Sequence, residues 1–344
     1  MFTKIKTDNG ETDMSILVLG GAGYIGSHTV REMIDSGLDV AVVDDLSTGH
    51  LEAVHPSARF YQADIRNRKL MDQIFDIEKV DGVVHFAAAS LVGQSIKDPL
   101  KYYDRNLCAT AAFLGSMEAH GVHHILFSST AAAYGTPAII PVSEDSDTAP
   151  INPYGETKLA IEKMLHWCEQ AYGLRYVSMR YFNAAGAHPS GEIGEDHEPE
   201  THLIPLVLQV PTGIRQKVFV YGDDYPTKDG TCIRDYVHVT DLARAHVLSM
   251  EYLLDGGKSD VFNLGNGNGY SVYDIIKTAC YVTKSFVRYE VIQRRTGDPA
   301  ALVASSEKAK TILGWNPQYG DINDIVSTAW KWHSTHRTGY RNWE

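Results

Sequence analysis

A glycine-rich turn directly follows a short apolar run near the N-terminus and restricts the folds open to this chain. Residues 16–19 are Ile-Leu-Val-Leu, a run typical of a strand buried on both faces, as in a parallel sheet. Glycines follow at positions 20, 21, 23 and 26, and a helical pattern covers residues 25–34. A strand, a glycine turn and a helix in this order make a site for phosphate groups. The turn therefore predicts an α/β protein that binds a dinucleotide.

Similar apolar runs alternate with helical patterns along the first half of the chain. The expected strands lie at 40–43, 83–86, 125–127 and 176–179, and further helices at 102–117 and 157–172. Strands alternating with helices form right-handed crossovers, which stack into one parallel sheet. We therefore expect an α/β fold, a Rossmann-type doubly wound parallel sheet.

The carboxylate after the second expected strand indicates which dinucleotide is bound. Asp44 stands about twenty residues beyond the glycines, where a carboxylate binds the adenosine ribose diol. It would repel a 2′-phosphate, and no Arg or Lys follows it in residues 45–49, so the cofactor is expected to be NAD. The alternative is a solvated loop aspartate. The first group of expected NAD contacts is Gly20, Gly23, Tyr24, Ile25, Gly26, Asp44, Asp45, Leu46, Ser47 and Thr48.

The rhythm of the sequence changes after about residue 186. Gly, Pro and acidic residues fill 188–200, and shorter elements follow, with helices near 240–254 and 272–282 capped by Thr240 and Ser271. We expect a Rossmann domain over 14–186 and a smaller C-terminal α/β substrate-binding lobe over 187–344, with the chain free to cross between lobes. Residues 1–13 are polar, precede a second methionine and are taken as an N-terminal extension.

Charge and cysteine usage restrict the partners of the chain. The formal net charge of -12 and the lack of Lys/Arg runs argue against nucleic-acid binding, so an anionic substrate needs a local arginine cluster. No apolar run is long enough to span a membrane, and none is expected to do so. The four cysteines are far apart, without a metal-binding spacing, which predicts reduced thiols, a cytoplasmic location and no metal site.

Two further motifs supply side chains for chemistry at an alcohol. Tyr154 and Lys158 share a helix face at a spacing of four, and a neighbouring ammonium favours the phenolate that a general base requires. Thr130 ends the strand over 125–127, at the edge where open α/β sheets bind ligands. Beside a nicotinamide, the three groups predict hydride transfer at an alcohol carbon. The alternatives are a helix-surface pair and a polar strand cap.

Taken together, these residues resemble the extended short-chain dehydrogenase/reductase family, and more closely, from Met14 over nearly the whole chain, the UDP-glucose 4-epimerases. The resemblance also includes Asp64-Ile65, His85-Phe86-Ala87-Ala88, Asn106, Arg180-Tyr181-Phe182-Asn183 and Gly186-Ala187-His188-Pro189. It implies further NAD contacts from Asp64, Ile65, Phe86, Ala87, Ala88, Ser90, Asn106, Thr130, Tyr154, Lys158 and Phe182. It implies UDP-sugar contacts from Asn183, Leu203, Phe219, Tyr221, Arg234, Arg295 and Asp298.

Three positions depart from better-known family members. Ser90 replaces a lysine near the cofactor, and His202 replaces an asparagine that contacts the nucleotide. Leu302 occupies a position linked to the size of the sugar pocket, which leaves N-acetylated UDP-hexosamines open as additional substrates.

The resemblance implies an isomerase of galactose metabolism that interconverts UDP-glucose and UDP-galactose through a 4-keto intermediate, and a homodimer formed through the helices over 102–117 and 157–172. A 4,6-dehydratase is disfavoured because Ala131-Ala132-Ala133 follows Thr130 where dehydratases carry acidic residues. Another 4-epimerase, such as one acting on UDP-glucuronate, stays open. A redox sensor that binds NAD without catalysis is disfavoured by the presence of Tyr154 and Lys158.

Overall fold

The computed structural model describes residues 14–295 and 298–341, so the extension expected over residues 1–13 lies outside the described residues. The described chain divides into two compact units. The first comprises residues 14–128, 157–178 and 243–260, and the second comprises 129–156, 179–242 and the remainder from 261. The chain thus passes between the two units several times along its length.

The main sheet has the strand order β10-β6-β5-β4-β1-β2-β3. The bounds of its strands are β1 (Ser15–Leu19), β2 (Asp39–Asp44), β3 (Arg59–Gln62), β4 (Gly82–His85), β5 (His124–Thr130), β6 (Arg175–Tyr181) and β10 (Asp260–Leu264). The pairs β1–β2, β2–β3, β1–β4 and β4–β5 are parallel. The order 3-2-1-4-5-6 is that of doubly wound dinucleotide-binding folds, so the predicted fold class is confirmed.

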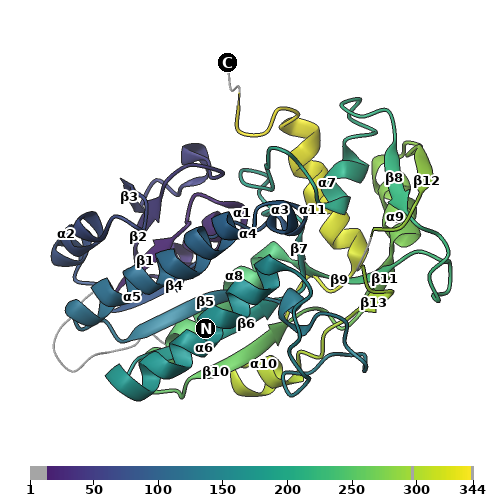
Figure 1. Cartoon of the computed structure of the whole chain (residues 1–344). Helices are drawn as coiled ribbons and strands as arrows, with labels where there is room; N and C mark the ends of the chain where they lie inside the picture. Colours follow the sequence, from purple (N-terminus) through teal and green to yellow (C-terminus); the bar gives the residue numbers. More distant parts are fainter. Residues whose placement is uncertain (1–13, 296–297, 342–344) are drawn as a thin grey trace. The chain divides into compact units, whose positions relative to one another are not determined.

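Helices cover both faces of this sheet, and Figure 1 shows α5 and α6 running across one face. The longer helices are α1 (Tyr24–Asp35), α2 (Arg68–Glu78), α5 (Ala109–Ala119), α6 (Pro153–Tyr172) and α8 (Val239–Leu254). Short helical turns are η1 (Leu51–Ala53), α3 (Val92–Lys97), α4 (Pro99–Tyr102) and the π-helical η2 (Tyr103–Cys108). The helix expected over 102–117 is therefore α4, η2 and α5 in succession.

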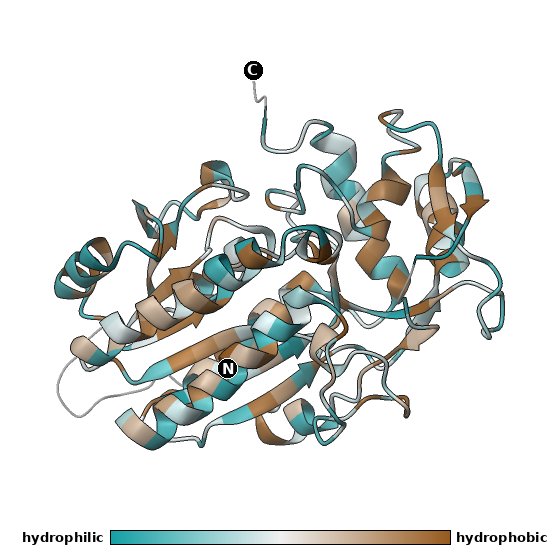
Figure 2. Ribbon diagram, viewed as in Figure 1, coloured by the Kyte–Doolittle hydropathy of each residue, from teal (hydrophilic) through white to brown (hydrophobic). Residues whose placement is uncertain are grey.

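Successive side chains of β1 point to opposite faces of the sheet and pack against the helices on each face. Leu17 and Leu19 are fully buried in a cluster with side chains of α2, α5 and α6. Ile16 points to the opposite face, where its tip and Met250 of α8 lie close to Gly82. Because both faces are covered, the strands are apolar along their length, and most are brown in Figure 2.

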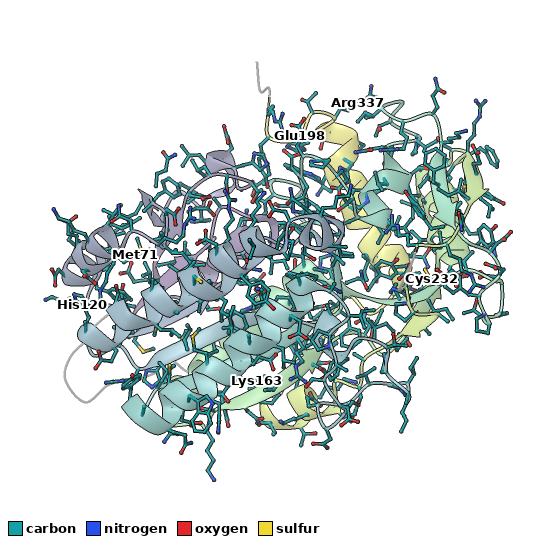
Figure 3. All side chains as sticks on the ribbon, viewed as in Figure 1. Met71, His120, Lys163, Glu198, Cys232 and Arg337 are labelled. Atoms are coloured by element: carbon teal, nitrogen blue, oxygen red, sulfur yellow. The ribbon has the colours of Figure 1, made fainter. Side chains whose placement is uncertain are left out.

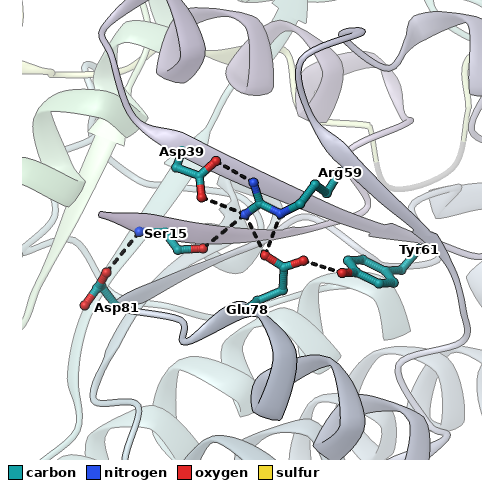
Figure 4. Close-up of polar contacts among 6 residues, drawn as sticks. All are labelled: Ser15, Asp39, Arg59, Tyr61, Glu78 and Asp81. Carbon is teal, nitrogen blue, oxygen red and sulfur yellow. Dashed lines mark hydrogen bonds and ion pairs between the residues drawn. The ribbon is translucent and has the colours of Figure 1, made fainter. Parts of the chain in front are cut away.

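An ion-pair network joins the N-terminal ends of three strands (Figure 4). The guanidinium of Arg59 donates to both carboxylate oxygens of Asp39, at 2.5 and 2.7 Å, and to Glu78 at 2.7 Å. Glu78 also accepts from the hydroxyl of Tyr61, whose pKa rises to about 12 through burial and this hydrogen bond. The network fixes the sheet at the edge opposite to its glycine turn.

The second unit is built around smaller sheets. Strands β7 (Asn183–Ala185), β11 (Gly269–Ser271) and β13 (Ala301–Leu302) pair with β9 (Ile233–His238), while β8 (Val218–Tyr221) pairs with β12 (Tyr289–Ile292). Its helices are η3 (Ala131–Tyr134), α7 (Leu203–Leu208), α9 (Val272–Thr283), α10 (Glu307–Ile312) and α11 (Ile322–Thr335). Side chains of α7, α9 and α11 form an apolar core with β8 and β9.

The two expected helix caps have different outcomes. Ser271 caps α9 and forms a capping box with Asp274, as predicted. The prediction for Thr240 is wrong, because α8 begins at Val239 and the N–H of Thr240 donates to the imidazole of His238 at 3.1 Å. No helix in the described part of the chain is both long and apolar enough to cross a membrane.

Candidate active site

The glycine turn of the first unit brings the backbone close to the neighbouring strand end. Gly20 adopts a positive φ of 76°, and a Cβ there would lie 2.7 Å from the backbone nitrogen of Ala87. The turn leads into α1, which begins at Tyr24 and Ile25 after Gly23 and has no side-chain cap. A helix N-terminus without a side-chain cap is the kind of end that binds a pyrophosphate in dinucleotide-binding folds.

The segment after β2 is fixed to this turn by Asp44. Its carboxylate is 8% exposed and accepts the N–H of Ala22 at 3.0 Å and of Leu46 at 2.9 Å. Burial raises the pKa of Asp44, and these two hydrogen bonds oppose the shift. Leu46 has a φ of 57°, a rare conformation for leucine of the kind that concentrates at functional sites. Asp45 accepts the N–H of Ser47 at 2.8 Å, so the loop is internally ordered.

Asp64 and Ile65, which follow β3, lie in different surroundings. Asp64 forms an ion pair with Arg66 at 2.6 Å, and this contact lowers the pKa of the Asp64 carboxyl. Ile65 is buried in the core of the sheet. Only the polar member of the pair thus has its side chain at the surface.

Asn106 organises the loop that follows β4. Its side-chain amide donates to the carbonyl of Ala89 at 3.0 Å and to Thr157 at 3.1 Å, and its oxygen accepts the N–H of Ala89 at 2.8 Å. The residue is fully buried in η2, and π-helical turns often occur at functional sites. The same loop carries Ala87 and Ala88, while Ser90 is exposed.

Thr130 and Tyr154 are brought near each other by a close backbone approach in the second unit. Thr130 ends β5 and accepts the N–H of Ala132 at 3.1 Å, which starts η3. A Cβ on Gly155 would lie 2.7 Å from the carbonyl oxygen of Ala132, so only glycine fits there. The first turn of α6, which carries the half-buried Tyr154, therefore packs directly on the turn that follows Thr130.

Lys158 is one of the largest buried side chains of the protein. Its Nζ donates to the carbonyl of Ser128 at 2.6 Å and lies 4.8 Å from the centre of the Phe127 ring. Burial lowers the pKa of Lys158 to about 7, against the opposing charge of Glu162. Burial also lowers the pKa of His85 to about 3, and the charge of Lys158 adds to that shift. An ammonium is thus held beneath the C-terminal end of β5.

These features fit a bound dinucleotide. The glycine turn leaves no room for a side chain, the start of α1 offers N–H groups, and each oxygen of Asp44 keeps a second acceptor position for a ribose hydroxyl.

The expected UDP-sugar residues all lie in the second unit, and two arginines dominate them. Arg234 in β9 forms an ion pair with Asp298, and its side chain is 14% exposed. Arg295 lies over the ring of Tyr221, 3.9 Å from its centre. Guanidinium groups held by a carboxylate and by an aromatic ring suit recognition of phosphate oxygens and of a base. Both arginines are candidates for the local positive charge that an anionic substrate of this acidic chain would need.

The remaining expected substrate residues are distributed over other elements of the second unit. Asn183 begins β7 and pairs with Tyr236, Leu203 begins α7, and Phe219 lies in β8 beneath the Nζ of Lys217. Phe182 packs with Tyr134 in a small apolar cluster that Leu302 also contacts.

Comparison with known proteins identifies the family. The model of the NAD dependent epimerase/dehydratase family matches residues 16–265. The UDP-glucose 4-epimerase of Lacticaseibacillus casei is 55% identical over 327 residues, which cover 95% of this chain and 99% of the relative. The chain belongs to this epimerase family. The predicted resemblance is thereby confirmed.

Solved epimerase structures agree over the same length. The crystal structure of a UDP-glucose 4-epimerase matches with a TM-score of 0.93 and 53% identity, covering 95% of this chain and all of the other. The Bifidobacterium longum enzyme, crystallised with NAD+ and UDP, matches with a TM-score of 0.90 and 38% identity, over 95% of this chain and 100% of that one.

Two features of this epimerase were not expected from the sequence. Asp235, beside Arg234, accepts backbone N–H groups from Asn266, Gly267 and Ala304, which no local pattern indicates. A cluster of two glutamates and two histidines precedes α7. The sequence carries a signal for this cluster, since Glu and His recur within residues 195–202, although their spacing matches no common metal-binding motif.

Proposed function

We propose that this protein interconverts UDP-glucose and UDP-galactose by inverting the sugar at C4. The observation that carries the proposal is the 55% identity to a UDP-glucose 4-epimerase across 95% of the chain. Tyr154, Lys158 and Thr130 support it, because they supply a base, a cation and a hydrogen-bonding hydroxyl.

In the proposed reaction, three side chains act at the C4 hydroxyl of the sugar. Tyr154 takes the hydroxyl proton, Thr130 holds the same oxygen by a hydrogen bond, and the Lys158 ammonium favours the phenolate of Tyr154. Bound NAD supplies the acceptor, and afterwards the donor, of the C4 hydrogen. Arg234 and Arg295 hold the UDP group while the 4-keto sugar turns and presents its other face. The reaction therefore has no net redox change.

The proposed NAD site comprises the glycine turn, α1, the segment after Asp44, and Asn106, with Asp64, Phe86 and Ser90 around it. The alternative of a UDP-glucuronate epimerase is tested by the choice of sugar. N-acetylated UDP-hexosamines are further candidate substrates, because Leu302 is only half-buried beside the apolar cluster of Phe182 and Tyr134.

The test is an end-point NMR assay of purified protein with UDP-galactose and, separately, UDP-N-acetylgalactosamine, without added reductant. Formation of UDP-glucose is expected, and conversion of the acetylated sugar would extend the range of substrates. Unchanged UDP-galactose with NAD supplied would contradict the proposal.

A homodimer formed through α5 and α6 is also proposed. The two helices share an apolar hollow of about 210 Å³, lined by Leu114, Met117, Met164 and Cys168 among others. Trp167 on α6 is 69% exposed nearby. An apolar hollow and an exposed aromatic side chain on the same helix support an interface here. The four cysteines are free thiols, which supports a cytoplasmic location.

A further inference from the structure

The segment ahead of α7 gathers four side chains that bind metals. Glu195, His197, Glu200 and His202 each direct one nitrogen or oxygen atom to the same point, and these atoms all lie within 4.8 Å of one another. Glu195, His197 and Glu200 are not among the residues expected to contact NAD or the UDP sugar. His202 stands where family members carry an asparagine that contacts the nucleotide, and Leu203 follows it directly.

The distances between these atoms are close to those of a tetrahedral site. Nδ1 of His197 lies 3.3 Å from Glu195 and 3.8 Å from Glu200, and Nδ1 of His202 lies 2.7 Å from Glu195 and 3.3 Å from Glu200. Metal–ligand bonds of about 2.0–2.2 Å in a tetrahedron place neighbouring ligand atoms about 3.3–3.6 Å apart. The four distances lie on both sides of this range, and those to Glu200 run to its two different oxygens, so binding of one ion requires side-chain rotation.

The buried carboxylate of Glu195 would be stabilised by a cation. Glu195 is 4% exposed, and its Oε1 makes no hydrogen bond of acceptable geometry among the described residues. A buried carboxylate oxygen that faces two imidazole nitrogens suits a shared cation, which would displace the imidazole protons.

Surrounding contacts hold the ligands in place before any ion binds. Glu200 accepts the N–H groups of Thr201 at 2.6 Å and of His202 at 2.7 Å. The backbone carbonyl of Glu195 accepts from the indole of Trp332 in α11 at 3.1 Å.

The C-terminal segment holds the same stretch of chain from another side. Asp196 accepts the N–H of Tyr340 at 3.0 Å, and Arg341 pairs with Glu198. His202 is 48% exposed on its side chain, which leaves a path for an ion to enter.

The donor atoms select the class of metal. Two imidazoles with two carboxylates suit Zn²⁺ and its neighbours in the first transition row, whereas Mg²⁺ and Ca²⁺ prefer oxygen ligands only. We propose that Glu195, His197, Glu200 and His202 bind one divalent transition-metal ion of the zinc class, which fixes the conformation of the segment ahead of α7.

The test uses Co²⁺, because its visible absorption reports tetrahedral ligation. The full-length protein is dialysed against a chelator and titrated with Co²⁺, and one ion per chain with intense d–d bands is expected, with displacement by Zn²⁺. The variants His197→Gln and His202→Gln should bind at least about 100-fold more weakly, because each loses a ligand. His166→Gln, at an exposed position on α6, should bind as the wild type does.

Thermal unfolding provides a second readout that does not depend on catalysis. Zn²⁺ should raise the Tm of the wild type and of His166→Gln by several degrees, but not that of His197→Gln or His202→Gln. Wild-type protein without stoichiometric d–d bands overturns the proposal whether or not the variants fold. Equal Co²⁺ affinity in the folded variants overturns it as well, since the ion would then lie elsewhere. Neither result would argue against the proposed epimerase activity, which is tested separately with UDP-galactose.

Discussion

Burial distinguishes Lys158 from the other lysine of α6. Lys158 is 2% exposed and donates to a strand carbonyl, whereas Lys163 is exposed on the same helix and is labelled in Figure 3. Since burial lowers the pKa of Lys158 to about 7, its charge is complete only below neutral pH and is lost as the pH rises through that value.

Replacing Lys158 should therefore change both the rate and its pH dependence. In Lys158→Met the phenol of Tyr154 loses its cationic neighbour, so kcat should fall by about 10²-fold or more, and the acidic limb of the kcat/KM profile should move to higher pH. Steady-state rates from acidic to basic pH measure this effect. Lys163→Met serves as the control and should keep the wild-type profile. An unshifted acidic limb in Lys158→Met would show that the cation does not act on the base.

Tyr154→Phe removes the base while keeping the ring. Turnover should fall by about 10²–10⁴-fold, while the circular dichroism spectrum and the affinity for NAD stay near those of the wild type. Tyr172→Phe, on an exposed residue of the same helix, is the matched control and should retain full activity. Wild-type rates in Tyr154→Phe would remove this residue from the mechanism.

At this scale, residues with a fixed spacing in sequence could be predicted, and residues joined only in space could not. The turn at Gly20, Asp44 and the pair Tyr154–Lys158 follow local patterns. The ion pair of Arg234 with Asp298 joins positions 64 residues apart, and no periodicity indicates it. The resemblance to the family implies a role for both residues in UDP-sugar binding, but it does not indicate this pairing.

Among the elements, β3 depends on polar contacts more than on burial. Its pattern is half-buried and ends in an exposed residue. The continuous apolar run that predicts β1, β2, β4, β5 and β6 is therefore absent, and β3 is not among the expected strands. Its pairing with β2 instead places Arg59 beside Asp39 and the buried Glu78.

Arg59→Met should lower the free energy of unfolding of the protein. Loss of one partner of a buried ion pair costs about 3–5 kcal/mol. We expect about 2 kcal/mol here, because the side chain of Arg59 is 41% exposed and solvent screens the pair. Urea denaturation measures the change.

The control for this substitution is Lys310→Met, which breaks an exposed ion pair with Glu307 in α10 and should cost less than about 0.5 kcal/mol. Equal stability of Arg59→Met and Lys310→Met would contradict a structural role for the network.

Helix boundaries were predicted best where an apolar stripe continues. The helix expected over 157–172 is present as the longer α6, which starts at Pro153, where Asn152 accepts the N–H of Gly155 at 2.9 Å. The helix expected over 102–117 contains the π-helical η2, whose buried Asn106 bonds to a distant loop. A tertiary contact of this kind leaves no mark on helical periodicity.

For the whole molecule, the passage of the chain between two units follows from which helices cover the sheet. Most residues of α6 and of α8 belong to the first unit, where Leu165 and Met250 are buried. The composition change near residue 186 reports only one of these passages, so sequence alone could not place the others.

Association into dimers is a property of the whole molecule that one side chain can test. If α5 and α6 form the interface, Trp167→Asp should place a charge in it and convert the dimer to a monomer of 38.1 kDa. Size-exclusion chromatography with light scattering measures the mass. Phe286→Asp, at an exposed aromatic residue of the second unit, is the control and should stay dimeric. A dimeric Trp167→Asp variant would place the interface elsewhere.

The central claim is that the C4 hydrogen leaves the sugar and returns to it within one enzyme. The most direct measurement supplies UDP-galactose carrying deuterium at C4 and follows the product by NMR in ordinary water. Because the hydrogen moves between sugar and bound cofactor without meeting solvent, UDP-glucose should keep deuterium at C4. Product with protium at C4 would show exchange with solvent and contradict the account.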